Sequence, residues 1–404
     1  MVVRPYPTRF VNLDAARAQF GDRVDRLGAY LWRGDDAADA AIDALAALGP
    51  ARGSALVDEA LNGRQLDVPP LQSLVASAST VPAWLEWDRV ERGASVLLRA
   101  GPLGGIVLGA KALIFGYSAP AGNKPLALSG RLQEMAGRRL NETARFVQAV
   151  SRRGGMRPGS DGFKITLKVR LMHAQVRRMI LDARHERMAW RAQDWGLPVN
   201  QHDMVATTLL FSSVTIEGLR QFGMHIDPDE ADDYMHLWRW VGTVIGVEPS
   251  LLPATEREGA ELARLIYATQ GPPDEDSRQL TDALLRSGER DGKPADRARA
   301  RRMRPVAIGL CRALIGDELA DQLHLPRTAY RFALPALRRA VATVELARRR
   351  SPRLTRRFEA AGLRYWDAVL ANGLGGATAE FALPERLRST MGSTTRSTAG
   401  STTE

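Results

Sequence analysis

Hydrophobic residues recur every three or four positions along most of the chain, and runs that alternate apolar and polar residues are scarce and short. A period near 3.6 residues is typical of an α-helix with one buried face, whereas a period of two is typical of a strand. The pattern therefore predicts an all-α fold, a single large helical domain over residues 1–388. Residues 389–404 have no apolar periodicity and are predicted to be a disordered tail.

Local signals mark several helix ends. The pair Asp35–Asp36 predicts the start of a helix that runs through Leu48, because such side chains cap free backbone amides. Gly49–Pro50 would end it, and Ser54 or Asp58 would begin the next helix. Further along, residues 151–162 are predicted to be a loop between two helical stretches.

Two longer segments depart from this regular pattern. Residues 270–296 form a polar excursion that is predicted to hold one short helix. The longest apolar stretch, 101–117, contains Lys111 and is short for a membrane-spanning segment, so we expect a buried, glycine-rich core helix.

The composition is that of a globular protein, with 45% hydrophobic and 25% charged residues, and the net charge is +10. A basic chain is a candidate for binding nucleic acid or membranes. Here much of the excess lies in short arginine clusters such as Arg338–Arg339, Arg348–Arg350 and Arg356–Arg357, without an aromatic motif or zinc finger nearby. We interpret these clusters as solvated helix faces and predict no nucleic-acid partner and no transmembrane segment.

A single cysteine, Cys311, excludes an intramolecular disulfide and any metal site built from several cysteines. The first residues lack the apolar core of a secretory signal. Both features lead us to expect a cytoplasmic protein.

The standard signatures HExxH, GxSxG, Walker A and a dinucleotide fingerprint are absent from the sequence. The most unusual segment is 168–181 (KVRLMHAQVRRMIL), in which Arg170, His173 and Arg177 share one helical face among apolar neighbours. Cations that are buried alone are costly, so an anionic group should lie beside this stripe. A b-type haem would supply this anionic group and also a role for the histidine, because guanidinium groups bind its propionates and an imidazole binds its iron. The alternative is a helix whose arginines point to solvent beside a hydrogen-bonded core histidine.

A second segment, 137–147, places Arg139 and Thr143 on one helical face, which Phe146 continues. His173 follows thirty residues after Thr143. This pairing resembles the latex-clearing protein or rubber oxygenase family, whose catalytic domain also occurs in oxygenases of secondary metabolism. Further similar motifs extend the resemblance over about Leu98 to Gly246, and they comprise GLPVNQHDM at 196–204, Phe211-Ser212, Gly218-Leu-Arg220 and YMHLWRWVGTVIG at 234–246.

The resemblance implies a helical fold with a globin-like core around non-covalent haem b, and dioxygen chemistry on a hydrophobic, unsaturated substrate. His173 would then be the proximal iron ligand, and Arg170 and Arg177 would hold the haem or its surrounding helix. Arg139 and Thr143 would line the distal side, where Arg139 would orient oxygen or stabilise a developing anion.

Two positions depart from the rubber-cleaving members of the family. Those members carry a lysine directly before the threonine, where this chain has Glu142, and a distal glutamate upstream, whereas the chain has no acidic residue between Tyr117 and Arg131. Glu142 is therefore a candidate catalytic base, or else a solvated or salt-bridged helix residue.

The remaining histidines receive lesser roles. His236 lies in an aromatic-rich helix and is interpreted as a hydrogen-bonded structural residue, while His202 and Asp203 are interpreted as caps of the helix that follows them. His185, His225 and His324 are given no role, and Cys311 lacks the ligand loop of a haem thiolate.

The leading hypothesis is a haem b oxygenase acting on an isoprenoid-like or secondary-metabolite substrate. The alternatives are oxidative cleavage of polyisoprene, a haem-binding or sensing protein without turnover, and a helical interaction protein that has lost the cofactor.

Overall fold

The computed structural model describes residues 5–128, 132–182, 189–290 and 294–373, with the side chains at 50, 132–139, 372 and 373 left out. Within these ranges β structure is limited to one isolated bridge between Phe10 and Gln270, so the prediction of an all-α fold is confirmed. The predicted tail at 389–404 lies outside the described residues.

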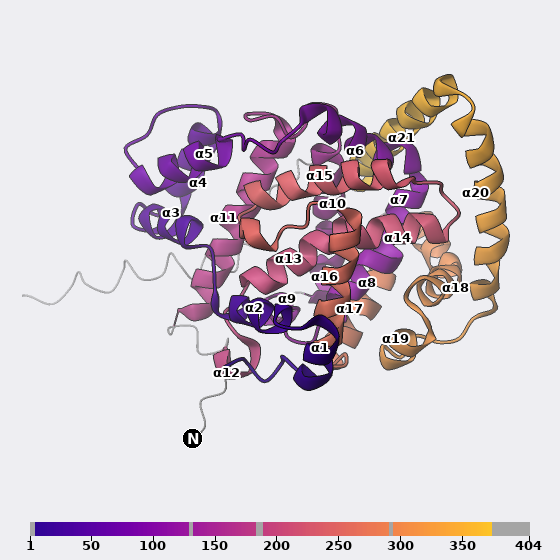
Figure 1. The fold of residues 1–404 in the computed structure, drawn as a ribbon, viewed down its shortest axis with the longest axis horizontal. Helices are drawn as coiled ribbons and strands as arrows, with labels where there is room; N and C mark the ends of the chain where they lie inside the picture. Colours follow the sequence, from indigo (N-terminus) through magenta and orange to yellow (C-terminus); the bar gives the residue numbers. More distant parts are fainter. Residues whose placement is uncertain (1–4, 129–131, 183–188, 291–293, 374–404) are drawn as a thin grey trace, which may run out of the picture.

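Helices follow one another through the whole described chain (Figure 1). The first half contains α1 (Leu13–Phe20), α2 (Arg23–Ala29), α3 (Asp36–Ala46), α4 (Pro50–Leu61), α5 (Pro69–Ser79), α6 (Trp87–Ala100), α7 (Pro102–Val107), α8 (Leu113–Tyr117), α9 (Lys124–Leu128), α10 (Leu132–Val150) and α11 (Asp161–Leu181). The second half contains α12 (Ala192–Trp195), α13 (Gln201–Phe211), α14 (Ser213–Gln221), α15 (Pro228–Val244), α16 (Glu256–Ala268), α17 (Glu275–Leu285), α18 (Pro294–Ile315), α19 (Asp317–Gln322), α20 (Ala333–Arg349) and α21 (Pro352–Gly373).

The predicted helix ends are partly right. Asp35 does cap α3, since its side chain accepts a hydrogen bond from the amide of Ala38, but the helix ends at Ala46. The next helix begins at Pro50, so Ser54 and Asp58 were wrong as its start. Proline is suited to a first helical position because that position needs no amide donor.

The apolar stretch 101–117 forms one unbroken helical run from Pro102 to Tyr117, which confirms the prediction of a core helix. It consists of α7, a π-helical turn at Leu108–Ala112 and α8. Lys111 lies in the π-helical turn with its side chain only 1% exposed, and its ammonium group lies 2.9 Å from the carboxylate of Glu217. Burial lowers the pKa of Lys111, and the carboxylate opposes this shift.

The predicted loop and excursion are confirmed with small shifts. The loop between α10 and α11 covers residues 151–160, and it is closed by Gly155 and Gly162, whose α-carbons lie against the carbonyl of Ala149. The segment 270–296 holds α17 and a single-turn 3₁₀ helix before α18 begins.

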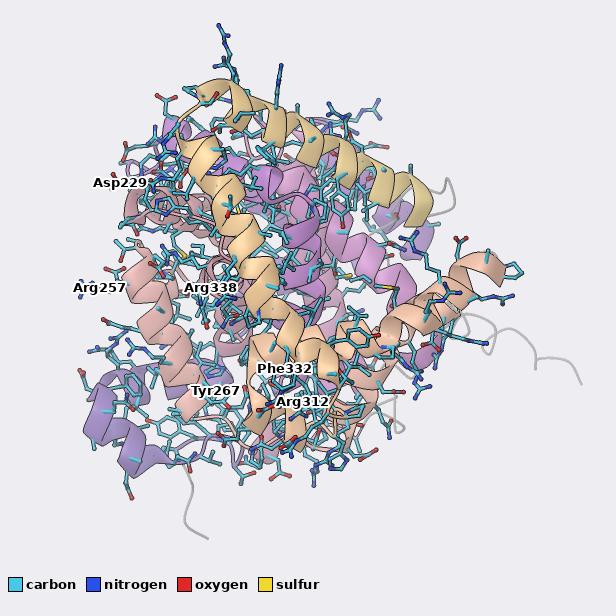
Figure 2. The ribbon with its side chains drawn as sticks, turned by 90° about the vertical axis from the view of Figure 1, so that its right-hand side faces the viewer. Asp229, Arg257, Tyr267, Arg312, Phe332 and Arg338 are labelled. Carbon is cyan, nitrogen blue, oxygen red and sulfur yellow. The ribbon has the colours of Figure 1, made fainter. Side chains whose placement is uncertain are left out.

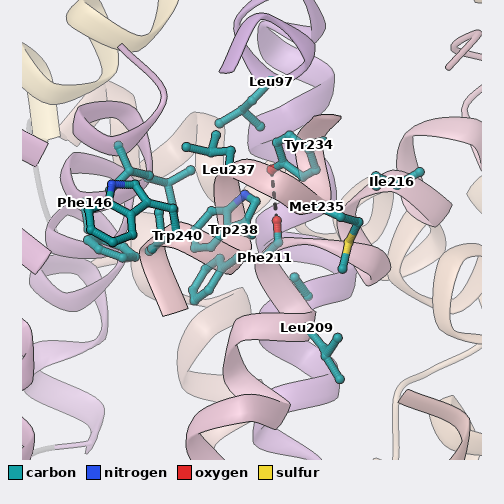
Figure 3. Packing of buried hydrophobic residues seen from close by; sticks show 14 of the residues in the cluster. Leu97, Phe146, Leu209, Phe211, Ile216, Tyr234, Met235, Leu237, Trp238 and Trp240 are labelled. Atoms are coloured by element: carbon teal, nitrogen blue, oxygen red, sulfur yellow. Dashed lines mark hydrogen bonds between the residues drawn. The ribbon is translucent and has the colours of Figure 1, made fainter. Parts of the chain in front are cut away.

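The centre of the core is α15, a helix with buried residues on every side. Trp238 stacks on Phe211 of α13, with ring centroids 5.3 Å apart, and meets Phe146 of α10 edge-on (Figure 3). Tyr234 donates a hydrogen bond of 2.9 Å to the carbonyl of Phe211, and Trp240 donates one to the carbonyl of Met156. The aromatic side chains of α15 therefore join α10 and α13 into one cluster.

Smaller hydrophobic clusters lie on either side of this centre. One joins α3, α4 and α5 to Leu171 and Ala174 of α11, and the other joins α8, α17, α18 and α19. Figure 1 shows α3, α4 and α5 at one end of the molecule and α20 at the other.

Among the described residues, no helix alone is long and apolar enough to cross a membrane; the pair Trp87–Ala100 and Pro102–Tyr117, bent by 87°, meets the length and composition criteria only jointly.

Close backbone contact between α6 and α21 generates a first prediction. A Cβ atom at Gly362 would lie 1.6 Å from the carbonyl oxygen of Leu98, and a backbone atom has no rotamer by which to move away. We expect Gly362→Ala to lower the free energy of unfolding by about 3 kcal/mol, measured by urea denaturation followed by circular dichroism.

Gly109→Ala is the matched control, because a Cβ atom there would meet no atom within 4 Å. Its stability should stay unchanged or rise by up to about 1 kcal/mol, since alanine favours helix more than glycine does. Equal stability of the two variants would contradict the close packing of α6 and α21.

Candidate functional site

His173 lies on α11 with a half-buried side chain, and its Nδ1 atom is buried without a hydrogen-bond partner. Burial and the neighbouring Arg177 guanidinium lower the pKa of His173 to about 4, and Asp35 opposes the shift. The imidazole is therefore neutral near pH 7. A neutral imidazole with an unpartnered nitrogen is the form that binds a metal ion.

The arginines beside His173 have carboxylate partners on α3. Arg170 donates two hydrogen bonds to Asp35, of 2.7 and 2.9 Å, and Arg177 donates three to Asp39, of 2.7 to 3.0 Å. The expected anionic group is thus supplied by the protein. Propionate binding by these two guanidinium groups would require breaking the ion pairs, so the structure fits the other predicted role, in which they hold the helix that carries His173.

Further charged pairs join the same helices at their surface. Lys168 lies 2.6 Å from Asp58 of α4, and Arg178 lies 2.7 Å from Asp43 of α3. These pairs are substantially exposed, whereas the side chains of Arg170 and Arg177 are only 12% and 3% exposed. Because solvent screens exposed ion pairs, we infer that the Arg170–Asp35 and Arg177–Asp39 pairs are the ones that fix α11 against α3. We call these two the inner ion pairs.

The loop before α13 also contacts the Arg177 side chain. Val199 has a φ angle of 50°, which is unfavourable for a β-branched residue, and its carbonyl accepts a 2.7 Å hydrogen bond from Arg177. Two residues further on, the side-chain amide of Gln201 donates to the carbonyls of Gly34 and Gly246, at 2.8 and 2.9 Å. Arg177 thus joins α11 to the loop before α13, and Gln201 joins the start of α13 to the chain segments before α3 and after α15.

Gly246 allows the Asp35–Arg170 pair to form. Its φ angle is +92°, and a Cβ atom there would lie 2.2 Å from an Asp35 carboxylate oxygen and 2.6 Å from Nε of Arg170. Sequence reasoning did not identify Asp39, and it included Gln201 and Gly246 only as members of family motifs. Asp35 was noticed only as a helix cap, and no local pattern pairs residues that are 135 positions apart.

The residues predicted for the distal side lie on α10, which packs against α11. Thr143 is half-buried, three residues before Phe146, whose ring packs into the aromatic core. Glu142 is half-buried and interacts with another group. Arg139 belongs to α10, but its side chain lies outside the described part of the chain.

The other histidines follow the predictions in part. His236 Nε2 accepts a 3.0 Å hydrogen bond from the amide of Glu86, which confirms a structural role, and burial lowers its pKa to about 4. His202 and Asp203 do not cap α13: the cap is Asn200, whose side chain accepts from the amide of Asp203. The Asp203 carboxylate instead forms a bidentate ion pair with Arg9, because an interior carboxylate needs a cation.

Cys311 and the three histidines without a predicted role require little comment. Cys311 is buried, and burial raises its pKa to about 12, so the thiol stays protonated near pH 7. His225 donates its backbone amide to Glu345, and His324 is exposed. His185 lies outside the described residues.

Among the described residues, the donors near His173 do not form a metal site built from side chains alone. The described residues contain no group of three or more His, Cys, Asp or Glu side chains placed to hold a metal ion. An iron bound at His173 would therefore bring further ligands of its own, as the porphyrin nitrogens of a haem do. The neutral ring and the unpartnered nitrogen are what an axial haem ligand needs.

Two cavities lie elsewhere. One, of about 440 Å³, lies between α17, α18 and the turn at His324, and the other, of about 260 Å³, lies between α4, α5 and the start of α11. Neither is lined by His173.

Comparisons with known proteins identify the family of the chain. The family model described as "ER-bound oxygenase mpaB/B'/Rubber oxygenase, catalytic domain" matches residues 87–346, which include α10 and α11 but not α3. A rubber oxygenase of Streptomyces sp. (strain K30) is 23% identical over 275 residues, which are 68% of this chain and 63% of that protein. The chain thus matches less than two thirds of that relative's length.

A solved structure shares the fold. The structure of a latex clearing protein in its closed state is similar to this chain with a TM-score of 0.62 and 18% identity, covering 83% of this chain and 90% of that one. The resemblance inferred from the sequence motifs, over about 98–246, is confirmed and extends further in both directions.

The inner ion pairs generate a second prediction. Asp39→Ala leaves the Arg177 guanidinium, in a side chain 3% exposed, without its counter-ion. We expect the free energy of unfolding to fall by about 2 kcal/mol, less than for a fully buried pair because Asp39 keeps a third of its side chain in water. Urea denaturation measures this loss.

Asp22→Ala is the control, because Asp22 pairs with Arg26 at side-chain exposures of 78% and 66%. Its effect should stay below about 0.5 kcal/mol. Equal effects of the two substitutions would show that the α3–α11 pair adds nothing to stability.

The lowered histidine pKa values generate a third prediction, on pH. Because His173 and His236 have pKa values near 4 in the folded chain and about 6.5 when unfolded, the unfolded state binds more protons between these values. Stability is therefore complete above about pH 6.5 and falls as the pH drops toward 4. We expect the urea midpoint to decrease between pH 7.5 and 4.5.

His236→Gln should reduce this decrease, whatever its effect at pH 7.5, because it removes one of the titrating groups. His324→Gln changes an exposed histidine and should leave the decrease as it is. An unaltered pH profile in His236→Gln would show that its imidazole is not held neutral.

Proposed function

Because the chain belongs to the family of ER-bound oxygenase mpaB/B' and rubber oxygenase catalytic domains, we propose that it is a haem b-dependent oxygenase that uses dioxygen on a hydrophobic, unsaturated substrate. The observation that carries the proposal is His173. Its imidazole is neutral and has a buried nitrogen without a hydrogen-bond partner. The helix that carries it is held by one ion pair before His173 in the sequence and one after it. A structural histidine in the same fold, His236, uses its ring nitrogen for a hydrogen bond instead.

Haem supplies, when bound, the iron at which dioxygen is activated. The proposed role of His173 is to remain unprotonated and to offer a nitrogen lone pair to this iron. Its pKa of about 4 keeps the lone pair available through the whole physiological pH range.

Arg170 and Arg177 act on His173 through the position of α11. Each is about one helical turn from His173, on either side of it, and each is held by a carboxylate of α3. The positive charge of Arg177 also lowers the pKa of His173 and so disfavours protonation of the imidazole. They are positioning residues in this proposal.

On α10 we assign Thr143, Arg139 and Glu142 to the oxygen-binding side, as the family resemblance implies. The Thr143 hydroxyl is a donor and acceptor for a bound oxygen ligand. The Arg139 guanidinium would stabilise negative charge that develops there. Glu142 would hold or move a proton, in place of the lysine that the rubber-cleaving members carry at this position.

Cleavage of polyisoprene is the second candidate function, and the match to a rubber oxygenase favours it. The presence of glutamate rather than lysine at 142 favours a different substrate. The two candidates differ in substrate size, and so they are separable by offering a small isoprenoid alkene and a latex emulsion side by side.

The fourth prediction tests the cofactor and the reaction together. The chain expressed with added haem precursor should purify with about one haem b per chain, shown by a Soret band and a pyridine haemochrome assay. We expect His173→Ala to lose the haem or shift the Soret band, because the replacement removes the axial ligand. Oxygen uptake with squalene should depend on the same histidine.

His236→Gln is the control for the loss of a buried histidine and should retain haem. Thr143→Val should bind haem normally and change oxygen uptake, because only the hydroxyl is lost. A wild-type chain that binds no haem after reconstitution would refute the proposal. Haem without oxygen uptake on squalene or latex would leave a haem-binding protein without oxygenase activity on these substrates.

A further inference from the structure

Most of the chain's net positive charge lies in its last two described helices. The hairpin of α20 and α21, residues 333–373, carries nine arginines but only Glu345, Glu359 and Asp367 as acidic residues, a net charge of +6 out of +10 for the whole chain. We call it the basic hairpin. It forms one edge of the molecule, with α20 outermost (Figures 1 and 2).

Eight of these arginines are exposed, and none of the eight has a carboxylate partner among the residues that the structure describes; they are Arg338, Arg339, Arg349, Arg350, Arg353, Arg356, Arg357 and Arg364. Only Arg348 is buried, and it pairs with Glu345 at 2.9 Å. Unpaired cations gathered at one edge make a strongly positive surface.

The inner side of α20 is fixed to the body of the protein. Glu345 accepts a hydrogen bond from the amide of His225, and a Cβ atom at Gly223 would lie 2.3 Å from the carbonyl of Arg338. The helix therefore cannot turn to bury its outer face without breaking these contacts.

The outer face of α20 combines arginines with large apolar side chains. Phe332 ends the 3₁₀ turn Ala329–Phe332 that leads directly into α20. Arg339, Leu346 and Arg350 follow it at intervals of seven, seven and four residues, which is the spacing of one helical face. Phe332 is 69% exposed and Leu346 53% exposed, and both rank among the most exposed large apolar residues of the described chain. On α21, Arg353, Arg357 and Arg364 likewise share an exposed face.

We propose that this outer face docks the protein on an anionic phospholipid bilayer. Apolar side chains enter the boundary between headgroups and acyl chains, while the guanidinium groups bind lipid phosphates and their stems lie along the apolar surface. Anionic lipids attract each nearby basic residue.

Other occupants match this face less well. Nucleic acid would neutralise the arginines but leave Phe332 and Leu346 in water, and a second copy of the hairpin would bring together two surfaces of like charge. The proposal is independent of the haem site, because α11 and α20 lie at different ends of the molecule in Figure 1.

The fifth prediction is a vesicle-binding test of the full chain. The protein should sediment with vesicles of phosphatidylcholine containing 30 mol% phosphatidylglycerol and not with pure phosphatidylcholine, and binding should weaken as salt rises. The charge-reversed variant Arg339→Glu/Arg350→Glu should bind at least tenfold more weakly. Phe332→Ser/Leu346→Ser should also weaken binding, because apolar insertion is lost.

Arg52→Glu/Arg153→Glu, on α4 and on the loop before α11, is the control with the same change of charge and should bind like the wild type. Circular dichroism establishes that all variants are folded. The proposal is overturned by absence of binding to the anionic vesicles, by equal loss in the control, or by binding that is indifferent to the Phe332 and Leu346 changes. Tighter binding to duplex DNA than to the vesicles would assign the face to nucleic acid instead.

Discussion

A guanidinium group that leaves water has to keep a counter-ion, and this requirement fixes the position of α11. Arg170 and Arg177 are largely buried, and both find their carboxylates on α3, at Asp35 and Asp39. His173 lies between them in sequence, so the two ion pairs fix the part of α11 that carries it. The imidazole is left with a buried nitrogen that no protein group occupies.

The same arrangement explains several local features that have no purpose by themselves. The strained backbone at Val199 brings a carbonyl to Arg177, and the absence of a side chain at Gly246 leaves space for the Asp35–Arg170 pair. Strain and glycine are both tolerated where the surrounding contacts fix the backbone. The helix α3 lies outside the segment matched by the family model, whereas α11, which α3 holds in place, lies inside that segment.

The two proposals place different demands on the molecule. The proposed haem site depends on interior contacts between α3, α10 and α11, whereas the proposed membrane docking depends on arginines that have no carboxylate partner among the described residues. Docking at α20 would hold the protein at a bilayer without placing His173 against the lipid.

The sequence by itself determined the features that local periodicity encodes: an all-α fold, the helix carrying His173, the loop between α10 and α11, and the Asp35 cap. It also identified His236 as structural, because a helix rich in aromatic and apolar residues is expected to lie in a core. Its motifs determined the family.

Only the tertiary structure decided which groups neutralise Arg170 and Arg177, and that Asn200 rather than His202 or Asp203 caps α13. It also showed that eight exposed arginines of α20 and the segment through α21 have no carboxylate partner among the described residues. Local patterns give the face on which a side chain lies. The partner on the opposite element is chosen by packing between segments more than a hundred residues apart, and no helical period records that choice.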